Sequence, residues 1–192
     1  MSQSICVYCS SSDAVDEKYF TIAENLGRLI GERGWELIYG GATVGLMGHV
    51  ARVAQKSGAN VVGIIPKSLS HIKNELVDEL VVCQDLRERK AIMEKRSTAF
   101  MALPGGFGTL DEVAEIITHK QLGFHRHPII LINGENFYGH LQAFFDEIIT
   151  KKFAKEDFRN FYYFANSSQE AVSYVEDYVQ PATPSKWFEN ER

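Results

Sequence analysis

Short apolar runs alternate along the chain with longer segments whose apolar residues recur every three or four positions. The short runs have the length of buried strands, and the longer segments have the period of amphipathic helices. The pattern predicts strands at residues 4–9, 36–39, 61–65, 80–83, 99–103, 128–132 and 161–164. It predicts one helix that follows the polar residues 10–13 and ends near residue 33, and a second that ends near residue 57. Further helices are expected over residues 86–97, 109–122, 138–151 and 171–179.

This alternation of strands and helices indicates the fold class. We expect an α/β, Rossmann-like, doubly wound and mostly parallel sheet flanked by helices in a single domain. A chain of 192 residues suits one such domain, which we assign to residues 1–180, followed by a C-terminal tail at 181–192. Residues 67–78 are expected to form a loop with a short helix. The buried stripe of the 138–151 helix is predicted to consist of Phe144, Phe145, Ile148 and Ile149.

Three polar or glycine-rich loops each follow a predicted strand, at residues 9–13, 40–48 and 105–109. In a parallel sheet the carboxyl ends of the strands meet at one edge, and ligands bind there near a switch in strand order. We therefore expect the three loops to converge on one site.

The loop at residues 103–112 carries the strongest chemical signal. Gly105, Gly106 and Gly108 allow the backbone to approach a ligand closely. Thr109 is predicted to open the next helix, whose free N–H groups favour an anion such as phosphate, with the carboxylate of Glu112 behind it. Residues 109–112 also fit a capping box, in which Glu112 folds back onto Thr109 as the helix cap and the glycines only form a turn.

Composition narrows the function classes. The net charge of −5 and the lack of a basic block argue against nucleic acid as a partner, and we expect no membrane partner either. Three cysteines without a disulfide framework and no targeting segment favour a soluble cytoplasmic protein. Cys6 and Cys9 form a C-x-x-C pair, but residues three apart on a strand point to opposite faces, so a redox role is disfavoured.

Several motifs together resemble one known family. The stretch from Pro104 to Glu112 resembles the signature PGGxGTxxE, and Arg89-Lys90-Ala91-Ile92-Met93 resembles an upstream Arg-Lys motif followed by methionine. Residues 39–48 resemble YGGGxxGLMG, and residues 7–12 resemble VFCGSS. These are motifs of the Lonely-guy family, the cytokinin riboside 5′-monophosphate phosphoribohydrolases, which are often labelled possible lysine decarboxylases.

The resemblance implies that residues 1–180 bind a nucleotide and hydrolyse the N-glycosidic bond of a nucleoside 5′-monophosphate, giving free base and ribose 5-phosphate. It implies Arg89 and Glu112 as catalytic residues, a homodimer, no cofactor and no metal. The substrate contacts that it implies are Ser11, Gly40, Gly41, Glu75, Lys90, Gly105, Gly106, Phe107, Gly108, Thr109, Leu110, Asp111 and Thr118. The placement of Glu75 and Thr118 rests on a rough alignment, and Glu75 is equally compatible with a solvated surface carboxylate.

Alternatives remain open on the sequence. The protein could be a general AMP or nucleoside 5′-monophosphate nucleosidase, or a non-catalytic nucleotide carrier or sensor. The sequence also departs from the family pattern at several positions, with Ser10 and Ala42 in place of glycines and His119 in place of a tryptophan. A lysine decarboxylase would need pyridoxal phosphate, for which no residue argues. His125 and His127 lack a third metal ligand, and Ser10 to Ser12 lack a nucleophile elbow.

Overall fold

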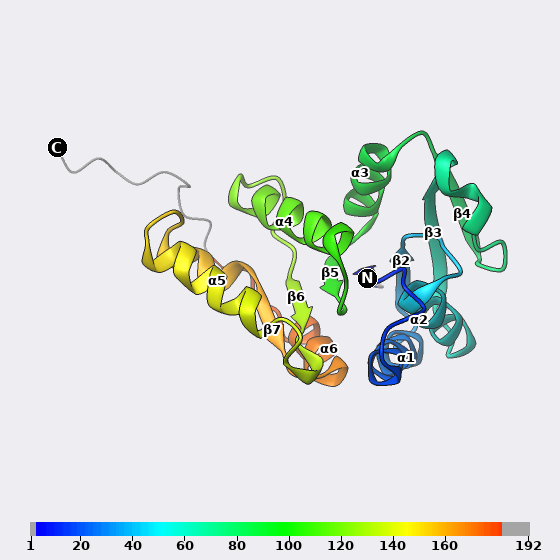
Figure 1. Cartoon of the computed structure of the whole chain (residues 1–192), viewed down its shortest axis with the longest axis horizontal. Helices are drawn as coiled ribbons and strands as arrows, with labels where there is room; N and C mark the ends of the chain where they lie inside the picture. The colour runs from blue at the N-terminus through cyan, green and yellow to red at the C-terminus, as the bar shows by residue number, and fades with distance from the viewer. Residues whose placement is uncertain (1–2, 182–192) are drawn as a thin grey trace.

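The computed structural model describes residues 3–181, and its strands form one parallel sheet (Figure 1). The sheet has seven strands in the order β4-β3-β2-β1-β5-β6-β7, and every pairing between these strands is parallel. The strands are β1 (Ser4–Tyr8), β2 (Glu36–Tyr39), β3 (Asn60–Pro66), β4 (Glu79–Cys83), β5 (Ala99–Ala102), β6 (Ile129–Ile132) and β7 (Tyr163–Ala165). The predicted single-domain, doubly wound architecture is confirmed.

The chain begins in the middle of the sheet, builds outward to β4, and then returns to place β5 beside β1. The register pairs Val7 of β1 with Tyr39 of β2 on one side and with Met101 of β5 on the other. The strand order therefore reverses between β1 and β5. A crevice forms at such a switch point, because the loops after the two strands run to opposite sides.

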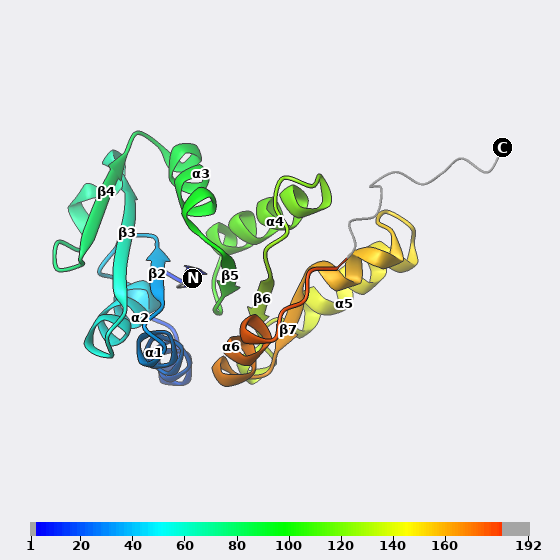
Figure 2. The same cartoon turned by 180° about the vertical axis from the view of Figure 1, so that it is seen from behind.

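Helices cover both faces of the sheet, as Figures 1 and 2 show from opposite sides. One core cluster lies under α1 (Glu17–Glu32), α2 (Gly45–Lys56) and α6 (Ser168–Glu176). The other lies under α3 (Leu86–Arg96), α4 (Phe107–Gln121) and α5 (Gly139–Thr150). Three short 3₁₀ helices complete the described chain: η1 (Lys67–Ile72), η2 (Gly134–Asn136) and η3 (Glu156–Phe161).

The two faces also separate the C-x-x-C cysteines. Cys6 packs in the cluster under α3, α4 and α5, whereas Cys9 packs in the cluster under α1, α2 and α6. Both are buried and free. The expectation that the pair straddles the sheet is confirmed.

Several predicted boundaries were wrong because capping side chains decide where helices begin. The first helix begins at Glu17 because Asp16 accepts a hydrogen bond from the backbone N–H of Lys18 at 3.2 Å. The last helix begins at Ser168 because Ser167 caps it. Its preceding strand is shifted to Tyr163–Ala165, since Phe161 ends η3.

The predicted buried stripe of α5 was also partly wrong. Phe144 is 57% exposed, and of the helix's residues only Ile149 is fully buried. Phe145 packs at the edge of the core against Tyr162 and Phe164. Helical spacing alone placed Phe144 in the stripe, but within residues 3–181 no element covers that side of α5.

The C-terminal tail was predicted at residues 181–192. Of these residues the structure describes only Pro181, and residues 182–192 lie outside the described residues. Within residues 3–181, each helix is too short or too polar to span a lipid bilayer.

Candidate functional site

A cavity of about 430 Å³ opens at the carboxyl edge of the sheet, beside the switch point between β1 and β5. The three loops predicted to converge all line it: residues 9–12 after β1, residues 40–47 after β2, and residues 106–112 after β5. Ile65 of β3 with Leu69 and Ile72 of η1 adds an apolar wall. Arg89 of α3 reaches in from the face of the sheet that α3 and α4 cover.

Arg89 and Glu112 form an ion pair inside this cavity. The Nη1 atom of Arg89 lies 3.3 Å from Oε1 of Glu112, and the two side chains are only 13% and 9% exposed. The Nε–H of Arg89 donates a hydrogen bond to the backbone oxygen of Ile64 at 3.1 Å. The guanidinium is therefore anchored to the end of β3 while it faces the carboxylate.

Burial raises the pKa of Glu112 to about 7. The nearby charges of Arg89 and Lys90 lower this pKa, whereas those of Asp111 and Glu115 raise it, and the desolvation of the carboxylate dominates. A carboxyl group that titrates near neutral pH can hold or release a proton at little cost. This property is common at catalytic positions and is consistent with an acid–base role here.

The start of α4 excludes the capping-box interpretation. The helix begins at Phe107, two residues earlier than predicted, and its cap is Gly106, which makes no side-chain capping bond. Thr109 is thus the third helical residue, and Glu112 contacts Arg89 rather than folding back onto Thr109. The first N–H groups of α4 consequently face the cavity without a capping side chain.

Thr109 is the polar side chain closest to this helix start. It is 3% exposed and lines the cavity, and its hydroxyl makes no hydrogen bond within residues 3–181. Its side chain lies over Gly105, where an added Cβ would come within 3.0 Å of the Thr109 Cγ2. Gly105 is therefore a glycine because Thr109 packs on it, whereas Gly106 and Gly108 have open space around their Cα atoms.

The structure brings eight of the predicted residues together around the cavity: Ser11, Gly40, Arg89, Gly106, Phe107, Gly108, Thr109 and Glu112. Phe107 stands at its mouth and is 92% exposed. Gly41 does not line the cavity. Its φ of +72° and its carbonyl, which accepts a hydrogen bond from the N–H of Asn74 at 2.8 Å, fix the turn beside it.

The other predicted contacts lie outside this cavity. Glu75 is 68% exposed in its side chain and pairs with Lys73 at 2.6 Å. The Nζ of Lys90 bonds Asp111 at 3.0 Å and also Glu115, so carboxylates on α4 neutralise its charge. Leu110 packs in the core, and the Thr118 hydroxyl donates to the backbone oxygen of Ala114 at 2.8 Å. The motif spacing could not distinguish the residues that face the cavity from those that face away, because neighbours along a helix point in different directions.

Sequence reasoning also missed residues that shape the site. The carboxylate of Asp13 accepts a hydrogen bond from the N–H of Gly45 at 2.8 Å, which joins two of the converging loops. The hydroxyl of the buried Tyr138 donates to the backbone oxygen of Leu103 at 2.6 Å, just before the glycine turn. Asp13 stood among cap-type residues that signalled only a helix start, and no local pattern pointed to Tyr138.

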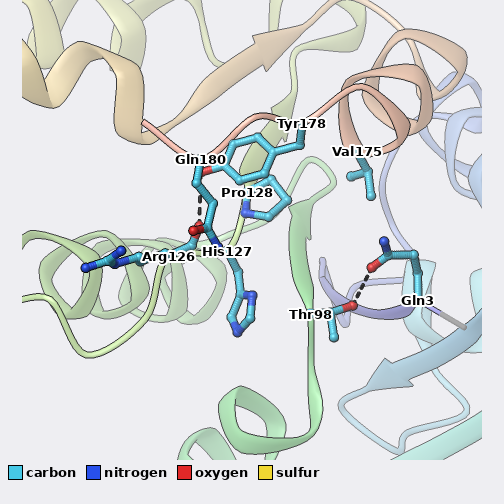
Figure 3. A pocket seen from close by; sticks show the side chains of 8 residues that line it. All are labelled: Gln3, Thr98, Arg126, His127, Pro128, Val175, Tyr178 and Gln180. Atoms are coloured by element: carbon cyan, nitrogen blue, oxygen red, sulfur yellow. Dashed lines mark hydrogen bonds between the residues drawn. The ribbon is translucent and has the colours of Figure 1, made fainter. Parts of the chain in front are cut away.

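A second cavity of about 320 Å³ lies at the opposite edge of the sheet, near the starts of β1, β5 and β6 (Figure 3). Figure 3 shows the guanidinium of Arg126 and the imidazole of His127 pointing in different directions rather than converging. Burial lowers the pKa of His127, which favours the neutral ring. Its hydrogen bonds join Thr98 to Gln3 at 2.6 Å and Tyr178 to the backbone of Arg126 at 3.0 Å. Among the residues that the structure describes, no carboxylate lines this cavity, so these residues supply no acid–base pair of the kind at the carboxyl edge.

The histidines singled out by sequence have structural surroundings. The Nε2 of His125 bonds the backbone oxygen of Ile116 at 2.9 Å, and the rings of His125 and His127 stack at 5.7 Å. Within residues 3–181, no three His, Cys, Asp or Glu side chains are grouped so as to hold a metal ion.

Known proteins match most of this chain. The family model described as "Possible lysine decarboxylase" matches residues 47–175. A relative from Oryza sativa subsp. japonica, named cytokinin riboside 5′-monophosphate phosphoribohydrolase LOG, is 41% identical over 177 residues, which cover 91% of this chain and 73% of that protein. The Arabidopsis thaliana protein LOG1, which has the same enzyme name, is also 41% identical. The match covers 91% of this chain and 83% of the LOG1 protein.

Solved structures share the fold. A molybdenum cofactor binding protein from Rippkaea orientalis aligns with a TM-score of 0.73 at 25% identity, over 92% of this chain and 96% of its own. The molybdenum cofactor carrier protein from Chlamydomonas reinhardtii aligns with a TM-score of 0.72 at 23% identity, over 92% and 97%, which shows the fold alone. The matches to the plant proteins cover 91% of this chain, and the chain belongs to the Lonely-guy family, whose family model carries the description "Possible lysine decarboxylase".

Proposed function

We propose that the protein hydrolyses the N-glycosidic bond of a cytokinin riboside 5′-monophosphate, releasing the free base and ribose 5-phosphate. The observation that carries this proposal is the buried Arg89–Glu112 pair beside the uncapped start of α4, in one cavity of about 430 Å³. The names of the relatives from rice and Arabidopsis describe the same reaction.

The start of α4 supplies the proposed phosphate site. The N–H groups at Gly106 to Thr109 and the positive end of the helix dipole favour a dianionic group. The hydroxyl of Thr109, a cavity-lining residue that is 3% exposed, is suited to donate to a phosphate oxygen. The 5′-phosphate at this position would direct the ribose toward Glu112, one helical turn further along.

Glu112 is the proposed catalytic carboxylate. Cleavage of the bond between C1′ and the base nitrogen passes through a state with positive charge on the ribose ring. The carboxylate can stabilise this charge and accept a proton from the water that attacks C1′. The electron pair of the broken bond leaves with the base, which takes up a proton. A carboxyl group with a pKa of about 7 is present partly as carboxylate at neutral pH.

Arg89 is proposed to act electrostatically. A guanidinium remains charged throughout the pH range of the reaction, so it is not a proton donor. Its position 3.3 Å from Glu112 lets it favour the carboxylate form and face the nucleotide from the side opposite the phosphate site. Its anchor on the Ile64 backbone fixes this direction.

A non-catalytic carrier is the alternative from another class, and solved structures with the same fold are titled a molybdenum cofactor binding protein and a molybdenum cofactor carrier protein. The enzyme is favoured because a carrier has no need of a buried carboxylate with a pKa near 7. The test is to incubate the protein with AMP and with N6-isopentenyl-AMP and to measure free base and ribose 5-phosphate. Release from both at equal rates would support a general nucleosidase. Binding of either without release of base would support the carrier.

We further propose that the active form is a homodimer. Leu122, Phe124 and Phe144 on and beside α4 and α5 are 44%, 69% and 57% exposed, which is a large apolar area for a surface. In a two-fold dimer formed through these helices, Thr118 on the exposed side of α4 would approach the cavity of the other copy. Analytical ultracentrifugation tests this proposal, and a fully active monomer would contradict it.

The remaining predicted contacts stay proposals. Gly41, Gly105 and Leu110 would shape the site rather than touch the nucleotide, and Lys90 with Asp111 would hold α3 against α4. Glu75 would need its loop to move before it could reach the substrate. Three free cysteines fit the proposed cytoplasmic location.

A further inference from the structure

Gly40, the residue after β2, lies directly against the guanidinium of Arg89. A Cβ added to Gly40 would overlap the Nη2 atom of Arg89, and it would lie 2.8 Å from Sδ of Met47 and 3.1 Å from Cζ of Arg89. The backbone of Gly40 does not have a left-handed φ, in contrast to that of Gly41 at +72°. A larger residue at position 40 is therefore opposed by neighbouring side chains, most closely by the guanidinium of Arg89 and next by the end of Met47, and not by the backbone conformation.

The guanidinium has little freedom to move away while keeping its contacts. Its Nε–H is bonded to the backbone oxygen of Ile64 at 3.1 Å, and its Nη1 lies 3.3 Å from Glu112. The Nη2 side rests on Gly40. If the planar guanidinium moved away from Gly40, it would lose either its hydrogen bond to Ile64 or its contact with Glu112.

We infer that Gly40 is a positioning residue for the reaction: its missing side chain allows Arg89 to lie flat at the end of β2 and to face Glu112. This inference rests on the proposed function for its catalytic consequence, but the placement of Arg89 against Glu112 can be measured without turnover. It also gives Gly40 a different role from the substrate contact that its glycine motif suggests.

Gly40→Ala, Arg89→Ala and the double variant test the inference. If Gly40 acts through Arg89, the methyl group moves the guanidinium and Gly40→Ala loses activity to about the level of Arg89→Ala. Removal of one preorganised electrostatic donor typically costs roughly 10²-fold in kcat. The double variant is then no slower than Arg89→Ala, because the guanidinium that the methyl group overlaps is already absent and only the flexible end of Met47 has to shift. The KM should change much less than kcat in all three variants.

A second measurement does not depend on catalysis. The titration of Glu112 is followed by NMR in protein labelled with ¹³C at the glutamate carboxyl carbons. Arg89 lowers the pKa of Glu112, so its displacement in Gly40→Ala should raise that pKa in the same direction as Arg89→Ala. The double variant should match Arg89→Ala.

The outcomes separate the hypotheses. Losses that multiply in the double variant, or an unchanged Glu112 titration in Gly40→Ala, would overturn the inference and favour a direct substrate contact. If the wild-type protein releases no base from any nucleotide, the proposed function fails and the titration alone decides the inference. If Gly40→Ala does not fold, the double variant should fold. A double variant that also fails to fold would refute a clash specific to Arg89.

Discussion

The carboxylate of Glu112 on α4 meets the guanidinium of Arg89 on α3 at 3.3 Å, in a cavity that both side chains enter from one face of the sheet. Each helix supplies one charge, and burial strengthens their mutual influence because little water screens it. The pKa of Glu112 near 7 results from a desolvation cost that the attraction of Arg89 only partly offsets. This balance leads to the first two predictions.

Replacing Glu112 with Gln should abolish most hydrolysis while preserving binding. The amide has nearly the same shape, but it can neither carry the negative charge that stabilises the ribose cation nor accept a proton from water. We expect kcat to fall by about 10²- to 10⁴-fold. Product release is measured with AMP and N6-isopentenyl-AMP, and calorimetry checks that nucleotide still binds. Full turnover in Glu112→Gln would remove Glu112 from the mechanism.

The pH dependence of kcat/KM should show an acid limb near pH 7. If Glu112 works as a carboxylate, activity rises with pH as the group loses its proton, and the midpoint in free enzyme follows its pKa of about 7. In Arg89→Ala the loss of the nearby positive charge should move this limb to higher pH. A profile that is flat between pH 5 and 9 would indicate that neither form of Glu112 is required.

Thr109→Val should weaken the recognition of phosphate. The change keeps the shape of the buried side chain but removes the hydroxyl that we propose bonds the 5′-phosphate. We expect KM for the nucleotide to rise roughly 10-fold, which corresponds to about 1.4 kcal/mol. Because the 5′-phosphate is absent from the nucleoside, any activity on it should be unaffected.

The matched control for Thr109→Val is Thr21→Val. Thr21 is an exposed threonine on α1 whose hydroxyl bonds the backbone oxygen of Glu17 at 3.3 Å, outside the cavity. Thr21→Val also removes a hydroxyl from a helix. Because Thr21 lies outside the cavity, the KM of this variant should stay within twofold of wild type. Equal effects of the two substitutions would argue against a phosphate contact by Thr109.

Lys120 should make the free energy of unfolding depend on pH above about pH 8. It is 3% exposed, and its ammonium group donates to the backbone oxygens of His127 at 2.8 Å and Phe161 at 2.9 Å. Burial lowers its pKa from 10.5 to about 8. Between these values the unfolded chain binds more protons than the folded protein, so this group makes the free energy of unfolding rise with pH.

The measurement compares wild type with Lys120→Met by urea unfolding from pH 7.5 to 9.5. The contribution of Lys120 over that range is roughly 2 kcal/mol. The cysteines of the unfolded chain also titrate there, whereas burial raises the pKa of Cys6 and Cys9 in the folded protein; this contribution is common to both proteins and cancels in the difference. The difference in unfolding free energy between the two proteins should therefore change by that amount. A constant difference would mean that Lys120 keeps an ordinary pKa in the fold.

Much of the fold followed from sequence because the period of apolar residues is a local property. The buried runs at β1, β3 and β6 could only be strands of a covered sheet, and their alternation with helices required parallel connections. From that topology the convergence of the three loops also followed, without knowledge of the strand order. Helix starts were less predictable, since Asp16 and Ser167 compete with other cap-type residues nearby.

The amino-acid sequence alone predicted only part of the candidate site. The sequence by itself identified the glycine turn, Glu112 and Arg89 as candidates, since their residue types are tied to local motifs, but it left a capping box open. Only the tertiary structure decided which partner each charge takes: Arg89 faces Glu112, whereas Lys90, its neighbour in sequence, is neutralised by Asp111 and Glu115. It also showed that Gly40 makes room for Arg89. Side chains that are adjacent on a helix diverge in space, and distances across elements are set by packing that no local pattern records.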